Sequence, residues 1–430
     1  MSWNVAIFDA SCSPAQSLFV MNLNTTEHEV SYQKAAAAIK HRHYVVDYLD
    51  SVDTEDEAAE LARKFLAQIG EVNPGSVKCF EADKENGTER LLGMIWKPDE
   101  DVFSFALSFR DDLQQLIAGD IIPTKREMLK VTMSIYDPLG IVAAFVIHGK
   151  VLVQDVWRAK IDWDEKIPWE IYCRWKEWLA VLRKMNTVKV ARCYFPGYNT
   201  ECFNSLDLHI FVDASEEAYS TVAYFRVIDN GRVRCSLVSS KTKVAPLQLL
   251  SIPRLELLAA VLGVRLRKTI EEKHSLKVRR TFFWSDSSTV IAWIRSDARR
   301  YRQFVAFRVN EILSLSSIQE WRWVPTKLNV ADEATKWGKG PSFDPESRWY
   351  HGPGFLYDNE EGWPKDCRGE ISTTVEELRP AFVYSHHIIK PAVKLERFSR
   401  WERLLRSMAY VVRFVDKTTG CGYTRKGLFN

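Results

Sequence analysis

The order of short apolar segments between residues 206 and 337 constrains the fold of this chain more than any other feature. Three strand-like segments come first, LDLHIFVDAS, TVAYFRVID and VRCSLVSSK. A helical pattern over 254–270 follows. Two more strands, RRTFFWSD and EWRWVPT, then alternate with helical segments near 288–316 and from Asn329. Three antiparallel strands followed by crossover-linked strands predict a mixed sheet with helices on its faces, which is an α/β fold.

Four acidic residues stand at the strand ends and helix starts of this pattern, namely Asp213, Glu256, Asp286 and Asp332. Asp213 follows an alternating apolar row and therefore faces away from it. We expect Glu256 in the first turn of a helix that is apolar almost all round, where an unpaired charge is costly. Taken alone, each acid has a structural interpretation, and Asp286 has the position of a helix N-cap or turn former.

A cluster of these four carboxylates requires cations. Two carboxylates about 5 Å apart repel each other by roughly 3 kcal/mol at an effective dielectric near 20. Ligand sets made only of oxygen favour Mg²⁺ or Mn²⁺, and two such ions about 4 Å apart suit in-line phosphodiester hydrolysis. The pattern therefore predicts a site for two ions of Mg²⁺ (or Mn²⁺).

The charge of the chain is unevenly distributed. The net charge is only +3, but residues 263–308 hold twelve Lys and Arg against four acids. This local excess fits a polyanion partner, and a solvated helix face is the alternative interpretation. The eight cysteines form no CxxC pair, which is typical of reduced thiols in the cytosol or nucleus. With no secretory signal and no run of 18 apolar residues, we expect a soluble, cytoplasmic protein with no membrane partner.

Four strings in this region resemble a known family. HIFVDAS, IPRLELLAA, WSDSSTVIAW and VPTKLNVADEATKW look like the ribonuclease H domain of Pao/BEL-type LTR retrotransposon polyproteins. The resemblance implies a ribonuclease H-like five-stranded mixed sheet over 201–342. It implies that the four acids hold the metal ions and cleave the RNA of an RNA–DNA hybrid. The chain departs from many ribonucleases H because no histidine lies between His274 and His351, which puts rapid turnover in question.

The basic excess fits this resemblance. Hybrid selection is expected to rest on contacts to the nucleic acid backbone and on duplex shape. The candidate phosphate contacts are Arg265, Arg267, Arg279, Arg280, Arg299, Arg300 and Arg302, with the rings of Trp284, Trp293 and Trp337 near sugars or bases.

The upstream region resembles a reverse transcriptase of the same polyproteins. HYVVDYLDS looks like the Tyr-x-Asp-Asp hairpin, with Tyr44, Val45, Val46 and Asp47 in the motif positions. Val46 replaces the first of the paired acids, and a valine cannot bind a metal ion. We therefore expect residues 1–95 to be a truncated, inactive palm remnant and 96–200 to be a mostly helical thumb or connection region. Residues 343–430 are expected to lead toward a missing integrase.

Three alternatives to a ribonuclease depend on other features of the sequence. Peptidase activity is expected to be absent, because VDTEDE lacks the glycine of an Asp-Thr/Ser-Gly site. An integrase-like Asp-Asp-Glu site would need Glu320 on a helix, whereas Glu320 opens a predicted strand. A third alternative is a nucleic-acid-binding retroelement relic, or a host-adopted fragment, that folds without turnover. Other retroelement products are possible partners, and a virus-like particle or the nucleus is an alternative location.

Overall fold

The computed structural model describes residues 94–105, 111–196, 205–229, 231–338, 340–365, 377–379 and 397–419, together with scattered positions between 19 and 91. The chain divides into two compact units, residues 1–375 and 376–430. The first unit contains every element that positions the candidate site.

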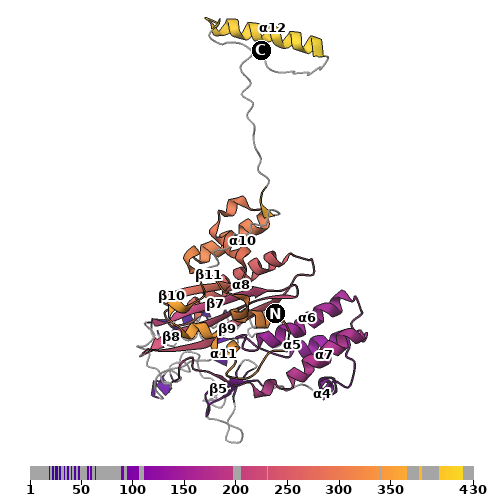
Figure 1. Ribbon diagram of the computed structural model, residues 1–430, viewed down its shortest axis with the longest axis vertical. Coiled ribbons are helices and arrows are strands. Elements are labelled where there is room, and N and C mark those ends of the chain that lie inside the picture. Colours follow the sequence, from indigo (N-terminus) through magenta and orange to yellow (C-terminus); the bar gives the residue numbers. More distant parts are fainter. Residues whose placement is uncertain are drawn as a thin grey trace, which may run out of the picture. The chain divides into compact units, whose positions relative to one another are not determined.

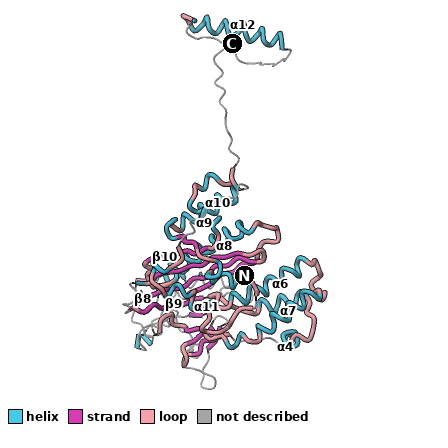
Figure 2. The backbone as a smooth tube through the Cα atoms, in the orientation of Figure 1, coloured by secondary structure: helices cyan, strands magenta, loops and turns pink. Residues whose placement is uncertain are grey.

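A five-stranded mixed sheet forms the centre of the first unit (Figures 1 and 2). Its strands are β7 (Asp207–Ala214), β8 (Ala218–Asp229), β9 (Arg232–Val244), β10 (Arg280–Ser285) and β11 (Trp321–Trp323), in the order β11-β10-β7-β8-β9. Strands β7, β8 and β9 form an antiparallel meander, whereas β10 runs parallel to both β7 and β11. The predicted α/β fold with a mixed sheet is confirmed.

Tight local features build the meander. Asp229 pairs with Arg232, so only two residues connect β8 to β9, and Gly231 has a φ of +76°. An Asn-Gly pair at this position is the preferred sequence for a two-residue hairpin loop, because both central residues need positive φ. All eight residues of β7 are buried, as expected for a strand covered on both faces.

Helix α8 (Ile252–Lys273) covers one face of the sheet, with Pro253 near its first turn. It approaches β7 closely at Gly263, where an added Cβ would lie 2.8 Å from Val212 Cγ1. Helices α9 (Ser288–Arg295) and α10 (Gln303–Leu315), with the 3-10 turns η4 (Ala298–Arg300) and η5 (Ile318–Glu320), complete this side. The helices predicted near 288–316 are confirmed.

Three helices form a layer beside the sheet, in which the middle one contacts β9 and the other two pack on it (Figure 1). They are α5 (Lys125–Met133), α6 (Ala143–Arg158) and α7 (Trp169–Leu182), preceded by α4 (Asp111–Ala118) and followed by η2 (Met185–Thr187). Apolar side chains of these helices share one core with Phe211, Tyr224 and Trp284 of the sheet. The edge of β9 is covered as well, because Ser240 N donates to Leu139 O at 2.9 Å.

Short segments after the sheet extend this core. They are η6 (Thr326–Leu328), η7 (Val330–Ala334), α11 (Arg348–His351), η8 (Gly354–Tyr357) and η9 (Glu360–Gly362). Trp349 donates from Nε1 to Ile141 O at 2.8 Å, and its own carbonyl accepts from the Tyr224 hydroxyl at 2.7 Å. Trp349 therefore connects the helical region to the sheet.

A second, smaller sheet contains β3 (Glu89–Leu91), β4 (Met94–Lys97), β5 (Val102–Ser104) and β6 (Val190–Ala191). Strands β4 and β5 form an antiparallel hairpin, in which Asp101 N donates to Pro98 O at 3.1 Å. Farther upstream, β1 (His43–Tyr44) pairs with β2 (Asp47–Tyr48), and Tyr44 lies opposite Asp47. Val45 and Val46 of the polymerase-like motif lie outside the described residues.

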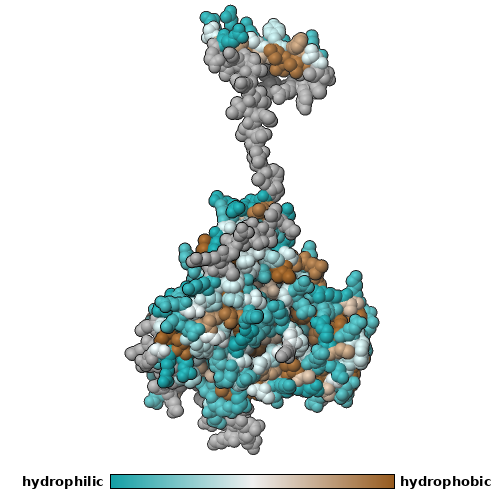
Figure 3. Space-filling model, in the orientation of Figure 1, coloured by the Kyte–Doolittle hydropathy of each residue, from teal (hydrophilic) through white to brown (hydrophobic). Residues whose placement is uncertain are grey.

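The second unit contains helix α12 (Trp401–Thr419). Apolar side chains at Trp401, Leu405, Met408 and Val412 are between 38% and 70% exposed, and Figure 3 shows hydrophobic residues gathered on this helix. None of the helices that the structure describes is long and apolar enough to cross a membrane.

Candidate active site

The carboxyl ends of three parallel strands form the edge of the sheet where the predicted acids lie. Val212 of β7 pairs with Ser285 of β10, and Ser285 pairs with Trp323 of β11. The residues that follow these strands therefore leave the sheet side by side. Asp213 is still within β7, Asp286 directly follows β10, and η7 with Asp332 follows β11 after one short turn.

Asp213 is buried and its carboxylate is surrounded by like charge. Its side chain is 5% exposed and accepts a hydrogen bond from the Thr335 hydroxyl. Burial raises the pKa of Asp213 to about 8, with a further contribution from the charge of Asp286. The protonated form therefore dominates at neutral pH unless a cation compensates the charge.

Asp286 does not cap the following helix. The N-cap of α9 is Ser287, whose Oγ accepts from Val290 N at 3.2 Å. The carboxylate of Asp286 instead accepts from Asn329 Nδ2 at 3.1 Å, and its carbonyl accepts from Trp323 Nε1 at 3.0 Å. The N-cap interpretation of Asp286 is therefore wrong. Its carboxylate faces Asn329 and lies near enough to Asp213 to affect the pKa of that residue.

Glu256 connects α8 to the same edge. The Ser287 hydroxyl donates to Glu256 Oε2 at 2.5 Å. Burial raises the pKa of Glu256, and the charge of Asp286 adds to this effect. Helix α8 begins at Ile252 and has no acid in its first turn, so the expectation of Glu256 in that turn is wrong, and Glu256 lies just beyond it. Glu256 therefore gains less from the helix dipole, which acts mainly within the first turn.

Asp332 lies in the first turn of η7 and pairs with a lysine of its own segment. Lys336 Nζ forms an ion pair with Asp332 Oδ1. The pKa of Lys336 is raised by this contact, and the charges of Asp213 and Asp286 contribute in the same direction. The negative charges of three of the four acids, Asp332, Asp213 and Asp286, therefore stabilise the ammonium group of Lys336.

Two polar side chains fix this arrangement. Asn329 is fully buried, and its Nδ2 also donates to Val212 O at 3.0 Å, which ties η7 to the end of β7. Its Oδ1 accepts from Ala331 N at 3.2 Å and so caps η7. Ser220 of β8 donates to Ala331 O at 2.9 Å. The acids are thus held by bonds between strands and turns that are far apart in sequence.

The donor set fits a hard divalent cation. All four acids supply oxygen, and Asp286 interacts electrostatically with both Asp213 and Glu256. Among the described residues, no three side chains of His, Cys, Asp or Glu are arranged as a ready ligand shell. The raised pKa of Asp213 reflects first its burial and then the charges of Asp286 and Asp332, which the nearby Lys336 offsets only in part. A bound Mg²⁺ or Mn²⁺ would lower it.

Most of the predicted phosphate-binding arginines pair with acids. Arg267 contacts Glu271 and Glu320, which also places Glu320 in an ion pair and not at the acidic edge. Arg279 and Arg280 both bind the buried carboxylate of Asp207, at 3.0 and 2.9 Å. Arg265 pairs with Glu311, and Arg299 pairs with Asp297. Arg300 and Arg302 are exposed.

The predicted nucleic-acid contact of Trp284 is wrong. Its ring is fully buried, and its Nε1 donates to His209 Nδ1 at 3.2 Å. Trp293 is also fully buried, because α9 packs its apolar face inward. Trp337 is partly buried against His148, with ring centroids 4.6 Å apart.

Sequence reasoning missed Thr335, Ser287, Asn329 and Lys336. The sequence offered two signals for them. Ser287 is a hydroxyl residue directly after Asp286, and the pair Thr335-Lys336 directly follows the turn that contains Asp332. Asn329 had the weaker signal of a helix N-cap.

The comparisons with known proteins agree with this site in part. The Pao retrotransposon-like RNaseH-like domain family matches residues 124–287, a segment that includes Asp213, Glu256 and Asp286. No curated protein matches the chain.

Three solved structures are similar with low scores. The N-terminal RNase H domain of Rv2228c from Mycobacterium tuberculosis, solved as a fusion with maltose binding protein, is 14% identical over 29% of this chain and 86% of that one, with a TM-score of 0.22. RNase H1 from the halophilic archaeon Halobacterium salinarum is 8% identical over 29% and 89%, with a TM-score of 0.20. A foamy viral protease-reverse transcriptase in complex with double-stranded DNA is 11% identical over 71% and 50%, with a TM-score of 0.18. Scores this low do not establish the fold, which rests on the strand order.

Proposed function

We propose that the protein hydrolyses the RNA strand of an RNA–DNA hybrid. The premise is the match of residues 124–287 to the Pao retrotransposon-like RNaseH-like domain family. One observation carries the proposal. Asp286, at the end of a parallel strand, interacts electrostatically with Asp213 of the neighbouring strand and with Glu256 of the helix above. Acids brought together in this way favour a site for divalent cations.

The residues that would hold Mg²⁺ or Mn²⁺ are Asp213, Glu256, Asp286 and Asp332. When bound, two such ions would activate a water molecule and stabilise the leaving 3′ oxygen.

The protein's own groups prepare this edge. Thr335 and Ser287 donate to Asp213 and Glu256, and these bonds orient the two carboxylates. Asn329 holds Asp286 from one side, which leaves its second oxygen available. Asp213 holds a proton at neutral pH without cations, and it releases that proton when positive charge arrives.

The test compares two Asp→Asn variants on a labelled RNA–DNA hybrid with Mg²⁺. Asp286→Asn keeps the side-chain shape but removes the charge, so we expect cleavage to fall by about 10³ or more. Asp164→Asn is the matched control, because Asp164 is an exposed carboxylate between α6 and α7 that pairs with Arg126, which is not a candidate phosphate contact. The control should cleave at nearly the parental rate. An Asp286→Asn protein that cleaves as fast as the control would remove the support for the proposal.

The second candidate is a protein that binds nucleic acid without cleaving it. The ion pair between Lys336 and Asp332 favours this candidate, because an ammonium group at the acidic edge opposes cation binding. Hybrid binding without cleavage by the parental protein, at any Mg²⁺ or Mn²⁺ concentration, would select it. The assignment of residues 1–95 and 96–200 to a polymerase remnant, and of 343–430 to a connector, stays a prediction.

A further inference from the structure

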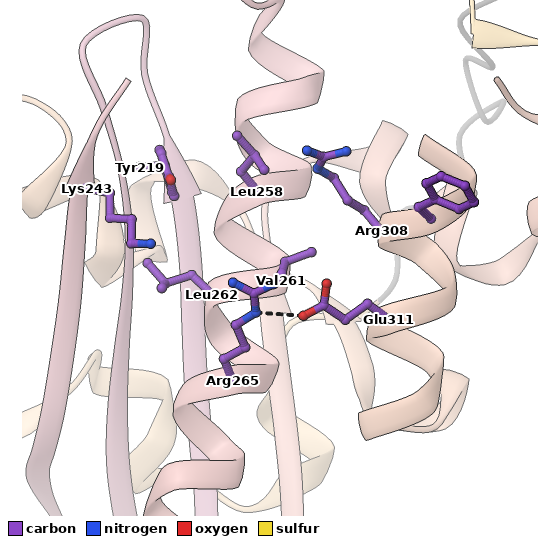
Figure 4. A pocket seen from close by; sticks show the side chains of 9 residues that line it. Tyr219, Lys243, Leu258, Val261, Leu262, Arg265, Arg308 and Glu311 are labelled. Atoms are coloured by element: carbon purple, nitrogen blue, oxygen red, sulfur yellow. Dashed lines mark hydrogen bonds and ion pairs between the residues drawn. The ribbon is translucent and has the colours of Figure 1, made fainter. Parts of the chain in front are cut away.

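A pocket of about 340 Å³ lies on the α8 face of the sheet. Its floor is apolar and consists of Leu258, Val261 and Leu262 on one face of α8. Figure 4 shows Lys243 extending toward this floor from the strand side, and Arg265 and Arg308 from the two helices. The volume is at the lower end of the range for small-ligand sites, about 300–1,000 Å³.

Positive charge exceeds negative charge in this pocket. Its lining includes Lys243, Arg265 and Arg308 but a single acid, Glu311, which pairs with Arg265 at 2.6 Å. Arg308 lies over the Phe304 ring at 3.5 Å, and Arg254 lies over the same ring at 4.8 Å. Burial lowers the pKa of Arg308, and the charges of Arg254 and Arg265 contribute to this lowering. An anion in the pocket would relieve this repulsion.

The pocket is close to the acids in the sheet register. Tyr219, which lines it, pairs with Ala214, the residue after Asp213, and Lys243 pairs with Tyr219. Adjacent strands are about 4.8 Å apart, so Lys243 is roughly 10 Å from β7 at the same level. On the helix side, Leu258 is two residues beyond Glu256. Val212 faces α8, so Asp213 points to the other face of the sheet, whereas Tyr219 lies on the α8 face. A strand of nucleic acid bound at the acids would reach the pocket by passing over the ends of the strands.

The lining combines cations with apolar and aromatic surface. Phe307 is 61% exposed at the pocket, and Tyr219 is half-buried there. Cations suit a phosphodiester, and exposed aromatic side chains suit an unstacked base, which is the combination found in grooves that bind single strands.

We propose that the pocket formed by Tyr219, Lys243, Arg265, Phe307 and Arg308 binds one nucleotide unit of a single-stranded segment that continues from the strand at the acidic edge. The class of ligand rests on the proposed function. The binding itself does not, because it needs neither metal nor cleavage.

The test measures binding of a labelled single-stranded oligonucleotide of about 16 nucleotides, the upper site size of such grooves. Fluorescence anisotropy is recorded in metal-free buffer over a range of salt concentrations. All proteins carry Asp286→Asn, so cleavage cannot affect the result.

The main variant is Lys243→Gln with Arg308→Gln. Each lost phosphate contact should lower the salt slope by about 0.7, so we expect a reduction of about 1.4 and an affinity loss of about tenfold. The charge-matched control, Arg126→Gln with Lys268→Gln, changes two exposed cations outside the pocket. It should leave the slope near the parental value. Equal slopes for the pocket variant and the control would overturn the proposal.

Two further measurements keep the test decisive if Arg308→Gln harms folding. Lys243→Gln alone changes an exposed residue and should reduce the slope by about 0.7. Phe307→Ala should weaken binding by about fivefold or more through lost stacking. Unchanged binding in both would reject the site.

A competition arm separates a strand from a free nucleotide. Nucleoside monophosphate that displaces the oligonucleotide at an equal concentration would show that the pocket binds free nucleotides, against the proposal. The two proposals can also fail separately. If the parental protein cleaves no hybrid but the pocket variants still lose strand binding, the proposed nuclease is rejected and the pocket is retained.

Discussion

Lys336 forms an ion pair with Asp332, so the chain itself supplies a positive charge to its acidic edge. When a cation binds Asp332, the ammonium group of Lys336 must either leave this carboxylate or share it with the cation. Its side chain is 56% exposed, which lets it turn into solvent but also weakens the ion pair.

Replacing Lys336 by Gln should therefore strengthen Mg²⁺ binding. We expect a gain of about threefold to tenfold in affinity, a modest effect because the pair is exposed. Isothermal titration of metal-free protein measures it. Lys327→Gln is the matched control, because Lys327 is an exposed lysine of the neighbouring turn. An affinity no higher than that of the parent would contradict competition by Lys336.

The raised pKa of Asp213 predicts how stability depends on pH without metal. The folded-state value of about 8 exceeds the ordinary 3.8, so the folded protein binds this proton more tightly than the unfolded chain does. The resulting stabilisation is full below about pH 4 and is lost as the pH rises toward 8. Asp137, whose pKa burial raises to about 6, acts in the same direction over a narrower window.

Asp213→Asn should consequently flatten the fall in stability between about pH 6 and pH 8, and roughly halve the fall between about pH 4 and pH 6, where Asp137 still contributes. Denaturant unfolding at several pH values measures this. Added Mg²⁺ should stabilise the parental protein most at pH 8, where the carboxylate is free to bind it. A parental protein whose metal-free stability rises from pH 6 to pH 8 would show that the assigned direction is wrong.

Asn329 is expected to be important for stability. Asn329→Ala leaves Val212 O and one oxygen of Asp286 without a donor and removes the cap of η7. We expect a loss of about 2 kcal/mol or more in the free energy of unfolding. Asn329→Asp instead adds a second negative charge beside Asp286, so its stability should recover with Mg²⁺ more than that of the alanine variant. Equal responses of the two variants to Mg²⁺ would argue against a cation site at Asp286.

Gly263 tests the packing of α8 on the sheet. An alanine Cβ would lie 2.8 Å from Val212 Cγ1, which is too close without movement of the helix. Overpacking costs about 1–3 kcal/mol, whereas the gain in helix propensity is about 1 kcal/mol. Gly263→Ala should thus lower the melting temperature, and Gly354→Ala, where the added Cβ meets nothing, should be nearly neutral. A Gly263→Ala protein that is more stable than the parent would show that α8 has room to move.

Primer extension tests the polymerase-like motif. The parental protein should add no nucleotide to a primed RNA template, because Val46 stands where a metal-binding acid is needed. Val46→Asp alone should not restore extension, since the motif is only one part of a polymerase site. Extension by the parental chain would show that HYVVDYLDS is aligned incorrectly.

The sequence was sufficient for the parts of the structure that repeat a regular pattern. Alternation and segment order predicted the mixed sheet, and the four acids stood out as candidates because each interrupts an apolar pattern. Pairing across long sequence distances left no such signal. Arg279 and Arg280 look like free phosphate contacts until Asp207, more than seventy residues earlier, is found between them.

The sequence did not reveal that Trp284 is buried, so its predicted contact with nucleic acid is wrong. Trp284 follows an apolar run next to an acid, which is also how an exposed stacking residue looks in sequence. Only the helices on the second face of the sheet, formed by residues 125–182, decide that this ring is inside. The start of α8 was predicted almost correctly, but an error of two residues was enough to place Glu256 in the wrong turn.

The shared core between those helices and the sheet has a consequence for how the protein is divided. Phe211, Tyr224 and Trp284 of the sheet are buried in the same core as apolar residues of α5, α6 and α7. A polypeptide starting at residue 201 would expose this surface to water and leave the β9 edge uncovered, which are the features of an aggregating fragment. The smallest soluble fragment should therefore extend from about residue 94 to residue 365. A recombinant protein that contains the sheet without these helices should not fold.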